Sequence, residues 1–348
     1  MNGRSVLGVK RRFEVVGRAA TGIYAILRSK FSGIEVLVPA NICPAAVYPI
    51  LYSGNRPVFC DVEDRSGNVS LKTLAAGITK ETKAVIVPHM YGNPVEDIVD
   101  IVEYCRANGL ILIEDCASAM GAEVHGVLVG SFGDYAIYST GHAKTIDVGG
   151  GGIVASDHEL GDVVSALSAV VADDELAQTE ELMFSKVYRR FLNTRKPLAD
   201  FSERQFFQRD FRAMFLRVAT KNLRQKVIHG VRDLLKDTVN ARRSRQSRLE
   251  RVFDELVPNG RRYHYAPGGV PWRFSFFVGE RNRQALADAM LSCDLPVSDW
   301  YPAMVELFGD EKPYPTANRL GRSILNLPLT VSDRQFEAAC DLVARFDR

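Results

Sequence analysis

The sequence has 348 residues, of which 46% are hydrophobic and 25% charged, as in an ordinary globular protein, so chain-wide disorder is excluded. Its 44 Lys and Arg residues nearly balance 42 Asp and Glu residues, which excludes a uniformly basic nucleic-acid-binding protein. The charge is nevertheless uneven, because residues 185–251 contain 19 basic residues and only 6 acidic ones. This basic segment is unusual for the chain and needs an explanation.

The six cysteines are scattered and form no CxxC pair, which argues against a zinc site and against a disulfide framework. Reduced thiols in the cytoplasm are the simplest interpretation. The sequence contains no apolar run of about 18 residues, and its N-terminus lacks the apolar core of a signal peptide. We therefore expect a cytoplasmic protein without a membrane span.

The first half of the chain alternates between strand and helix patterns. Short apolar runs predict strands at residues 35–38, 57–60, 84–87, 110–113, 135–138 and 152–155, and helical patterns lie at 44–52, 70–78 and 95–108. This alternation predicts a mainly parallel sheet with helices packed against it. Ligands of such sheets gather at the carboxyl ends of the strands, which directs attention to the residues that follow each one.

The second half has a different pattern. Residues 160–182 read as one acidic helix, and the basic segment follows. Beyond it we expect a strand at 272–278, a helix at 281–293, a strand or loop at 295–300, and a final helix at 331–346. This order predicts a second, smaller α/β domain.

Two residues near strand ends could carry chemistry. Asp115 follows the fourth strand, where a carboxylate can bind a metal, a ribose or a protonated ring nitrogen, or can simply cap the next turn. Lys144 lies five positions after Ser139 in the loop after the fifth strand. A desolvated lysine there can be an imine-forming nucleophile, although a solvated loop lysine is the alternative.

Two further stretches could bind an anion. Residues 18–22 (RAATG) precede a helical run at 23–28, so Ala20 and Thr21 could hold a phosphate, or Thr21 could be an ordinary N-cap. The four glycines at 149–152 match neither the dinucleotide fingerprint nor the P-loop, and a tight turn beside a bulky ligand is the better interpretation. No Gly-x-Ser-x-Gly elbow is present, which argues against a hydrolase. The histidines lack metal-ligand spacing, so we predict no metal site.

Together these stretches resemble the DegT/DnrJ/StrS family of pyridoxal-phosphate-dependent sugar aminotransferases. The resemblance rests on ordered motifs that cover residues 13–158 well and 240–348 loosely. The motifs are 36–40 (VLVPA), 53–61 (SGNRPVFCD), 82–92 (TKAVIVPHMYG), 113–122 (IEDCASAMGA), 130–134 (GSFGD), Ser139 with Lys144, the glycine run, 300–302 (WYP) and 325–329 (LNLPL).

The resemblance implies a fold-type I transferase, an α/β protein with a mostly parallel seven-stranded sheet and a smaller α/β C-terminal domain. We place the large cofactor-binding domain at 13–230 and the small domain at 231–348, with residues 1–12 packed nearby. A homodimer with active sites at its interface is implied as well.

The resemblance also assigns roles around pyridoxal 5′-phosphate. Lys144 would hold the cofactor and move a proton, and Asp115 would pair with the pyridinium nitrogen. The other expected cofactor-binding residues are Ala20, Thr21, Cys43, Ser118, Ser139 and Asn193.

Several positions depart from the family pattern. The candidates for the aromatic residue that usually stacks on the cofactor ring are here Asn41, Ile42 and Cys43, and Ser118 stands where a Gln is common. The glycine run replaces Gly-Glu-Gly-Gly, and the usual Ser-Gly-Thr is Arg-Ala-Ala at 18–20. Residues 193–195 are only a stand-in for the stretch that normally crosses the dimer. These changes keep the lysine and the aspartate but bear on the substrate.

We expect transfer of an amino group, from glutamate, to a nucleotide-linked keto-sugar. Alternatives keep the cofactor but dehydrate the sugar or use a non-sugar substrate, or keep only the fold in a binding protein. The family's dehydratase members have His at the lysine position, so Lys144 favours transamination.

The basic segment has its own alternatives. Phe207, Phe211 and Phe215 recur every four residues among arginines, which is typical of a core or dimer-contact face and, less often, of a helix on an anionic membrane. No nucleic-acid-binding motif accompanies the charge. We expect a dimer-contact or substrate-mouth segment that favours an anionic substrate.

Overall fold

The computed structural model describes residues 7–8, 11–194, 205–308 and 313–346. Its larger domain contains a seven-stranded sheet in the order β1-β9-β8-β5-β4-β2-β3. The strands are β1 (Arg12–Val16), β2 (Glu35–Pro39), β3 (Arg56–Cys60), β4 (Thr82–Pro88), β5 (Ile111–Asp115), β8 (Tyr135–Ser139) and β9 (Gly152–Ser156). The five strands from β8 to β3 are parallel. β9 pairs antiparallel with β8, and β1 pairs antiparallel with β9 and so runs in the direction of the five, which confirms the expected mostly parallel sheet.

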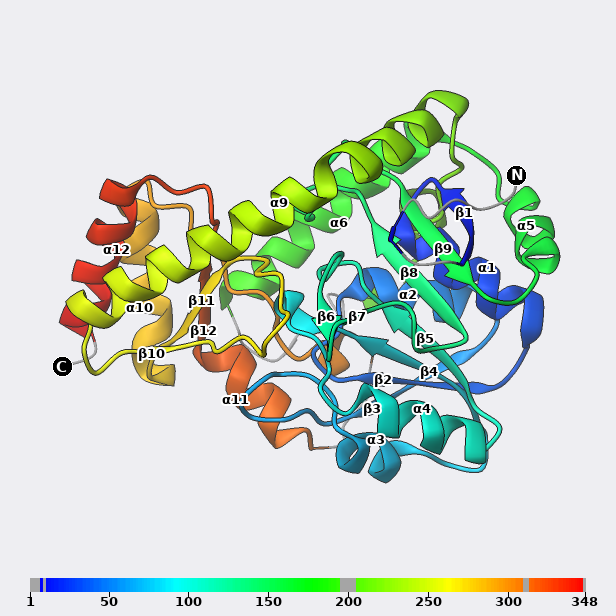
Figure 1. Cartoon of the computed structure of the whole chain (residues 1–348), viewed down its shortest axis with the longest axis horizontal. Coiled ribbons are helices and arrows are strands. Elements are labelled where there is room, and N and C mark those ends of the chain that lie inside the picture. Colours follow the sequence, from blue (N-terminus) through cyan, green and yellow to red (C-terminus); the bar gives the residue numbers. More distant parts are fainter. Residues whose placement is uncertain (1–6, 9–10, 195–204, 309–312, 347–348) are drawn as a thin grey trace.

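Helices cover both faces of this sheet (Figure 1). Alternate residues of each strand point to opposite faces, so Leu37 and Val85 join one core while Val36 and Ile86 join the other. One layer contains α3 (Leu71–Gly77), α4 (Ile98–Ala107) and part of α9, and the other contains α1 (Ala19–Lys30), α2 (Pro44–Tyr52) and α5 (Gly161–Ser168). The chain thus forms the three-layer arrangement of a doubly covered sheet.

Local signals set several of these helix starts. Ser70 caps α3 by accepting the N–H of Thr73, and the Thr73 hydroxyl accepts the N–H of Ser70 in return. Pro44 occupies the first position of α2, where its missing N–H costs nothing. The predicted bounds of α2 are therefore confirmed, and those of α3 are off by one residue at each end.

In the described part of the chain, α6 (Asp174–Thr194), α8 (Arg212–Phe215) and α9 (Lys221–Leu256) lie between the two domains along the sequence. The 36-residue α9 runs from the sheet of the larger domain to the smaller domain in Figure 1. Thr220 is the N-cap of this helix, and its hydroxyl accepts the N–H of Leu223. The domain boundary placed at residue 230 falls inside this continuous helix and stays a prediction.

The smaller domain packs helices against a three-stranded antiparallel sheet, β10-β11-β12. Its elements are β10 (Arg261–Arg262), β11 (Phe274–Phe277), α10 (Glu280–Ser292), α11 (Pro315–Ser323), β12 (Ile324–Leu327) and α12 (Asp333–Phe346). Shorter elements are the hairpin β6 (Glu123–Val124) and β7 (Val127–Leu128) and the 3-10 turns η1 (Met90–Gly92) and η2 (Val305–Phe308). The expected small α/β domain is thus present.

The structure corrects some element predictions. The single helix expected at 160–182 is wrong, because α5 ends at Ser168 and α6 begins afresh at Asp174. The side chain of Asp173 accepts the N–H of Leu176 and so caps a new helix. For residues 295–300 the loop alternative is confirmed, since they contribute only an isolated bridge between Ser298 and Asn326.

The phenylalanine stripe faces the protein interior. Phe207, Phe211 and Phe215 are at most 3% exposed and pack around Phe184 and Tyr48. The core interpretation is confirmed, and the stripe is not available to a membrane. Among the described residues, no helix combines the length and apolarity that a membrane crossing requires.

Candidate active site

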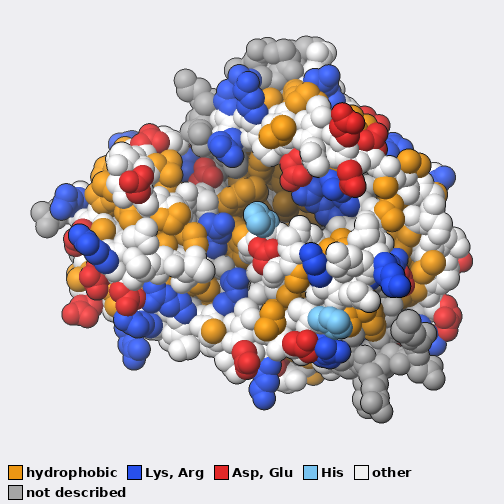
Figure 2. Space-filling model, turned by 90° about the horizontal axis from the view of Figure 1, so that it is seen from above, with side chains coloured by type: hydrophobic (Ala, Val, Ile, Leu, Met, Phe, Trp, Pro, Cys, Tyr) orange, Lys and Arg blue, Asp and Glu red, His pale blue; other side chains and the backbone are white. Residues whose placement is uncertain are grey.

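A cavity of about 690 Å³ opens at the carboxyl ends of β5 and β8. Figure 2 shows the molecule hollowed on one face, with basic and acidic side chains around the opening. The structure brings most of the predicted site residues together on its wall. They are Ala20, Cys43, Asp115, Ser118, Ser139 and Lys144.

Lys144 contributes a primary amine to the wall of the cavity. It lies in the loop between β8 and β9, and its Nζ donates a hydrogen bond to Ser118 Oγ at 3.1 Å. Burial lowers the pKa of the Lys144 amine, Arg273 lowers it further, and Cys43 and Asp115 act in the opposite direction. A lysine whose charge is penalised by burial more readily supplies a free amine, as an imine-forming nucleophile requires.

The smaller domain and α9 hold the lysine loop in place. The indole N–H of Trp272 donates to the carbonyl of Ala143 at 3.0 Å. The guanidinium of Arg242 donates to the carbonyl of Lys144 at 3.2 Å and also to those of Pro271 and Trp272. The loop therefore depends on residues about 100 to 130 positions away in the sequence.

Arg242 belongs to the basic segment, and its neighbours on α9 act similarly. Arg243 donates to the carbonyls of Gly268 and Gly269, and Arg245 donates to those of Leu329 and Val331. Much of the local positive charge therefore binds backbone carbonyls that join α9 to the rest of the chain. Arg217, in contrast, lines the cavity.

Asp115 is the acidic group of the site and ends β5. Its Oδ1 accepts the N–H of Ala117 at 3.0 Å. Burial raises the pKa of the Asp115 carboxyl, while the Ala117 N–H and the nearby Lys144 charge lower it. A cationic hydrogen-bond donor in the cavity would stabilise the anionic form of this buried carboxyl.

The N-terminus of α1 forms another part of the cavity wall. Ala19 and Ala20 occupy its first turn, where backbone N–H groups lack partners within the helix, and no side chain caps this end. Ser139 adds a hydroxyl at the end of β8. Such a set of donors suits a phosphate group.

The glycine run brings β9 close to this helix end. Gly149 and Gly151 have φ of +84° and +88°, a conformation that favours glycine. A Cβ on Gly152 would lie 2.7 Å from the carbonyl oxygen of Tyr138 and 2.9 Å from the nitrogen of Ala19. The run is therefore a tight turn into β9 that permits close approach to the α1 N-terminus.

Of the predicted residues, Thr21 does not present its side chain to the cavity in this structure. The Thr21 hydroxyl is bonded to the backbone of Arg217, accepting its N–H at 2.8 Å and donating to its carbonyl at 3.1 Å. Asn193 lies near the end of α6, and its side chain is outside the described residues.

Two cavity residues were missed when the sequence was considered alone. Arg217 is hidden among many arginines of the basic segment, and only the structure separates it from them. Tyr301 is part of the WYP motif, which indicated a substrate-domain landmark but assigned no role to its phenol. The tyrosine sits close enough to Cys43 and Asp115 for each of them to raise its pKa, after the larger effect of burial.

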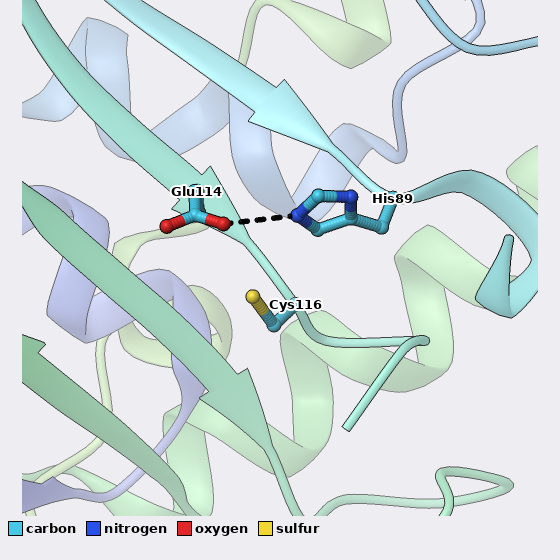
Figure 3. A group of neighbouring side chains, drawn as sticks. All are labelled: His89, Glu114 and Cys116. Atoms are coloured by element: carbon cyan, nitrogen blue, oxygen red, sulfur yellow. Dashed lines mark hydrogen bonds and ion pairs between the residues drawn. The ribbon is translucent and has the colours of Figure 1, made fainter. Parts of the chain in front are cut away.

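A buried group beside the site has the residue types of a metal centre. Figure 3 shows Glu114 on β5 pointing toward His89, with Cys116 beside them. His89 Nδ1 accepts the N–H of Val95 at 3.0 Å, which leaves Nε2 to donate to Glu114 at 3.2 Å. Both histidine nitrogens are therefore used within the protein.

The Glu114 carboxylate is used fully as well. It accepts the N–H groups of Gly130, Phe132 and Gly133 at 2.7–2.8 Å in addition to the His89 bond. Burial acts to raise the pKa of Glu114, but these hydrogen bonds outweigh it and the pKa is lowered. We interpret the group as a structural network that fixes the loop after β7 against β5.

The residues of the cavity fit pyridoxal 5′-phosphate. The buried carboxyl of Asp115 suits the ring nitrogen of the cofactor, and the nearby amine of Lys144 suits its aldehyde carbon. The α1 N-terminus and Ser139 suit the phosphate. The close packing at Gly152 leaves no room for a side chain at that residue, next to the α1 N-terminus. Cys43 supplies no aromatic ring at the position where the resemblance would place one.

Comparisons with known proteins agree with this chemistry. The model of the DegT/DnrJ/EryC1/StrS aminotransferase family matches residues 16–189. The chain is 44% identical over 129 residues to dTDP-4-dehydro-2,3,6-trideoxy-D-glucose 4-aminotransferase of Saccharopolyspora spinosa, covering 37% of this chain and 33% of that protein. It is 42% identical over 128 residues to GDP-perosamine synthase of Vibrio cholerae, covering 37% and 35%. The matches thus span about a third of these relatives.

Solved structures show the same fold over nearly the whole chain. The aminotransferase TlmJ from Streptoalloteichus hindustanus has a TM-score of 0.74 at 22% identity, covering 98% of this chain and 87% of that one. DesI, determined with its TDP-sugar product, also has a TM-score of 0.74, at 19% identity, covering 98% and 81%. The fold is that of fold-type I enzymes, and the chain belongs to the DegT/DnrJ/EryC1/StrS aminotransferase family, a membership that implies pyridoxal 5′-phosphate as its cofactor.

Proposed function

We propose that this protein is a pyridoxal-phosphate-dependent aminotransferase that moves an amino group from glutamate to a nucleotide-linked keto-sugar. Family membership and relatives named as aminotransferases of dTDP- and UDP-linked sugars support the reaction class. The observation on which the proposal rests is that Lys144, Asp115 and the N-terminus of α1 line the same cavity.

Each of these groups has a distinct role. The bound pyridoxal ring would supply an electron sink for the bond changes at the amino-bearing carbon. Lys144 would hold the cofactor through Nζ and, once released, move a proton to and from that carbon. Asp115 would accept a hydrogen bond from the ring nitrogen and keep that nitrogen protonated.

The remaining groups would bind and orient. The first-turn N–H groups of α1 and the Ser139 hydroxyl would hold the phosphate, which fixes the ring relative to Lys144. Arg18 and Arg217 also line the cavity, and each has an acidic neighbour, Glu181 at 3.5 Å and Asp174 at 3.0 Å. These exposed ion pairs are weak enough to rearrange toward the diphosphate of a nucleotide-linked sugar.

The proposal includes a homodimer and a cytoplasmic location. All six cysteines are free, which suits a reducing compartment. Size-exclusion chromatography with light scattering measures the assembly directly: twice the mass of the chain supports the dimer, and the mass of one chain contradicts it.

The reaction is tested by mass spectrometry of the products. The protein is incubated with the cofactor, glutamate labelled at its amino nitrogen, and a panel of nucleotide-linked keto-sugars. Incorporation of the labelled nitrogen into a sugar, abolished by Lys144→Ala, supports the proposal. A dehydrated sugar without nitrogen would instead identify the dehydratase reaction. If no panel member changes but a non-sugar ketone is aminated, the sugar assignment fails while the aminotransferase assignment stands.

A further inference from the structure

Tyr301 reaches the lysine from a different part of the chain. It lies between α10 and α11, in the segment that joins elements of the smaller domain, yet it lines the cavity and is only 5% exposed. Its backbone N–H donates to the Tyr91 hydroxyl at 3.3 Å. The proposed function assigns this buried tyrosine no role.

The phenol of Tyr301 shares a partner with Lys144. Ser118 lies close enough to the Tyr301 hydroxyl for hydrogen bonding to lower the pKa of the phenol, against the larger effect of burial, and Ser118 also accepts the 3.1 Å hydrogen bond from Lys144 Nζ. A serine hydroxyl has one donor and two acceptor positions, so it can serve both neighbours at once. The three side chains therefore form a continuous chain of polar groups.

The position of the Tyr301 ring is fixed by the residue that also holds the lysine loop. The ring stacks on Trp272 with centroids 5.5 Å apart and planes inclined by 23°. Trp272 in turn donates its indole N–H to the carbonyl of Ala143, the residue before Lys144. This aromatic pair thus connects to Lys144 twice, through the backbone and through Ser118.

The Ser118 hydroxyl, backed by that of Tyr301, can form a hydrogen bond with Lys144 in either protonation state of the amine. When Lys144 is protonated, Ser118 accepts from it and can donate onward to the Tyr301 oxygen. When Lys144 is neutral, the hydroxyl protons can turn the other way. Hydrogen bonds to a charged group are the stronger ones, so the chain favours the protonated amine.

We propose that Tyr301 is a positioning residue that, through Ser118, orients the Lys144 amine and stabilises its protonated form. The mechanistic value of this arrangement rests on the proposed function, because a lysine that must hold a cofactor and then move a proton needs a defined direction for its lone pair. The arrangement itself can be tested without cofactor or substrate.

The test measures the titration of Lys144 in the cofactor-free protein. Competitive labelling with acetic anhydride, followed by mass spectrometry of the Lys144 peptide, gives the pH midpoint of the amine. The titratable or charged groups that influence Lys144 are Cys43 on the α2 side, Asp115 on β5 and Arg273 beside β11. All three are kept in each variant, so a shift reports the hydroxyl chain.

Tyr301→Phe removes one hydroxyl and keeps the stacked ring. We expect it to lower the pH midpoint by about one unit, which is about a tenfold increase in free amine below the midpoint. Ser118→Ala should shift it in the same direction, and the double variant should shift it no further than Ser118→Ala alone, because the tyrosine acts through the serine.

Tyr263→Phe is the matched control. Tyr263 is buried in the same aromatic cluster, but its hydroxyl bonds to Asn93 and Ser66, and it does not line the cavity. An unchanged midpoint in Tyr301→Phe, a matching shift in the control, or additive shifts in the double variant would overturn the proposal. A shift confined to the Tyr301 and Ser118 variants together with no amino transfer on any substrate would retain it and reject only the proposed function.

Discussion

Arg242 on α9 and Lys144 in the β8–β9 loop are joined by a hydrogen bond of 3.2 Å from the guanidinium to the lysine's carbonyl oxygen. The same guanidinium also binds the carbonyls of Pro271 and Trp272, so it connects three segments at one point. The position of the reactive lysine thus depends on the longest helix of the described chain. Arg242 is partly buried, and this burial lowers its pKa.

Arg242→Ala should impair both stability and the lysine. It leaves three carbonyls without their donor, with an expected loss of about 1–3 kcal/mol in the free energy of unfolding. Arg243→Ala is the control, since Arg243 on the same helix also binds two carbonyls but contacts no residue of the lysine loop. Denaturant unfolding should show losses in both variants, while only Arg242→Ala should weaken cofactor binding. Equal cofactor affinities in the two variants would contradict this role.

Asp115→Asn should reduce amino transfer without destabilising the protein. The amide has no charge to hold a proton on the ring nitrogen, and a hydrogen bond to a charged group is worth about 1.5–3 kcal/mol, which is about 10- to 150-fold in rate. Because burial raises the pKa of this carboxyl, its neutral replacement should keep the melting temperature unchanged or higher. Steady-state kinetics and thermal unfolding measure the two effects. Wild-type kcat in the variant would exclude the assigned role.

Lys144→Met should alter how stability depends on pH. The folded protein lowers the pKa of Lys144 below its ordinary value of 10.5, so the protonated form is penalised only in the folded state. The penalty is complete below the folded pKa and disappears as the pH rises from that value to about 10.5. Near neutral pH the cofactor-free variant should therefore melt about 1–2 °C above the wild type. The gap should close toward pH 10, and a constant gap would contradict the assignment.

Glu114→Gln should be strongly destabilising. The carboxylate accepts four hydrogen bonds, and an amide would place its own N–H against donors, at a cost of about 3–5 kcal/mol. Since the pKa of Glu114 is lowered, its contribution is present above about pH 4.5 and is lost as the pH falls through the folded value. Because the ligand atoms of His89 and Glu114 are already used, a chelator should leave the melting temperature of the wild type unchanged. A drop on chelation would indicate a metal centre instead.

Gly152→Ala should weaken phosphate binding specifically. Its Cβ would lie 2.9 Å from Ala19 N and 2.7 Å from Tyr138 O, so the α1 N-terminus must move. Isothermal titration should show weaker binding of pyridoxal 5′-phosphate, while pyridoxal without the phosphate should lose much less. Gly161→Ala is a suitable control, because nothing lies within 4 Å of the added Cβ. The same loss for both ligands would place the effect elsewhere.

The central part of the parallel sheet is readable from the sequence because strands such as β2, β4 and β8 are buried on both faces. Runs such as the β4 residues Ala84–Val87 are continuous and apolar, and that pattern follows directly from burial. β1 is not evident from the sequence, because the charged residues Arg12 and Glu14 interrupt its apolar run at the sheet edge. α9 was not predicted either, since buried residues such as Val227 and Leu249 are sparse among many charged ones.

The site residues that could be predicted from the sequence are reactive side chains that lie at the end of a predicted strand or at the start of a predicted helix. Lys144 follows one strand of the parallel part of the sheet, Asp115 ends another, and Ala20 lies in the first turn of a helix, so the topology brings all three to one cavity. Tyr301 and Arg242 could not be placed in this way. Their contacts depend on how the smaller domain and α9 pack against the lysine loop, and sequence spacing contains no information about that packing.

Lys144 is expected to be the residue that binds the cofactor covalently. The purified protein is incubated with pyridoxal 5′-phosphate, reduced with borohydride, digested, and analysed by peptide mass spectrometry. We expect one dominant cofactor adduct, on the peptide that contains Lys144, and none at that site in Lys144→Ala. An adduct on another lysine, or no adduct in the folded wild-type protein, would show that Lys144 does not have this role.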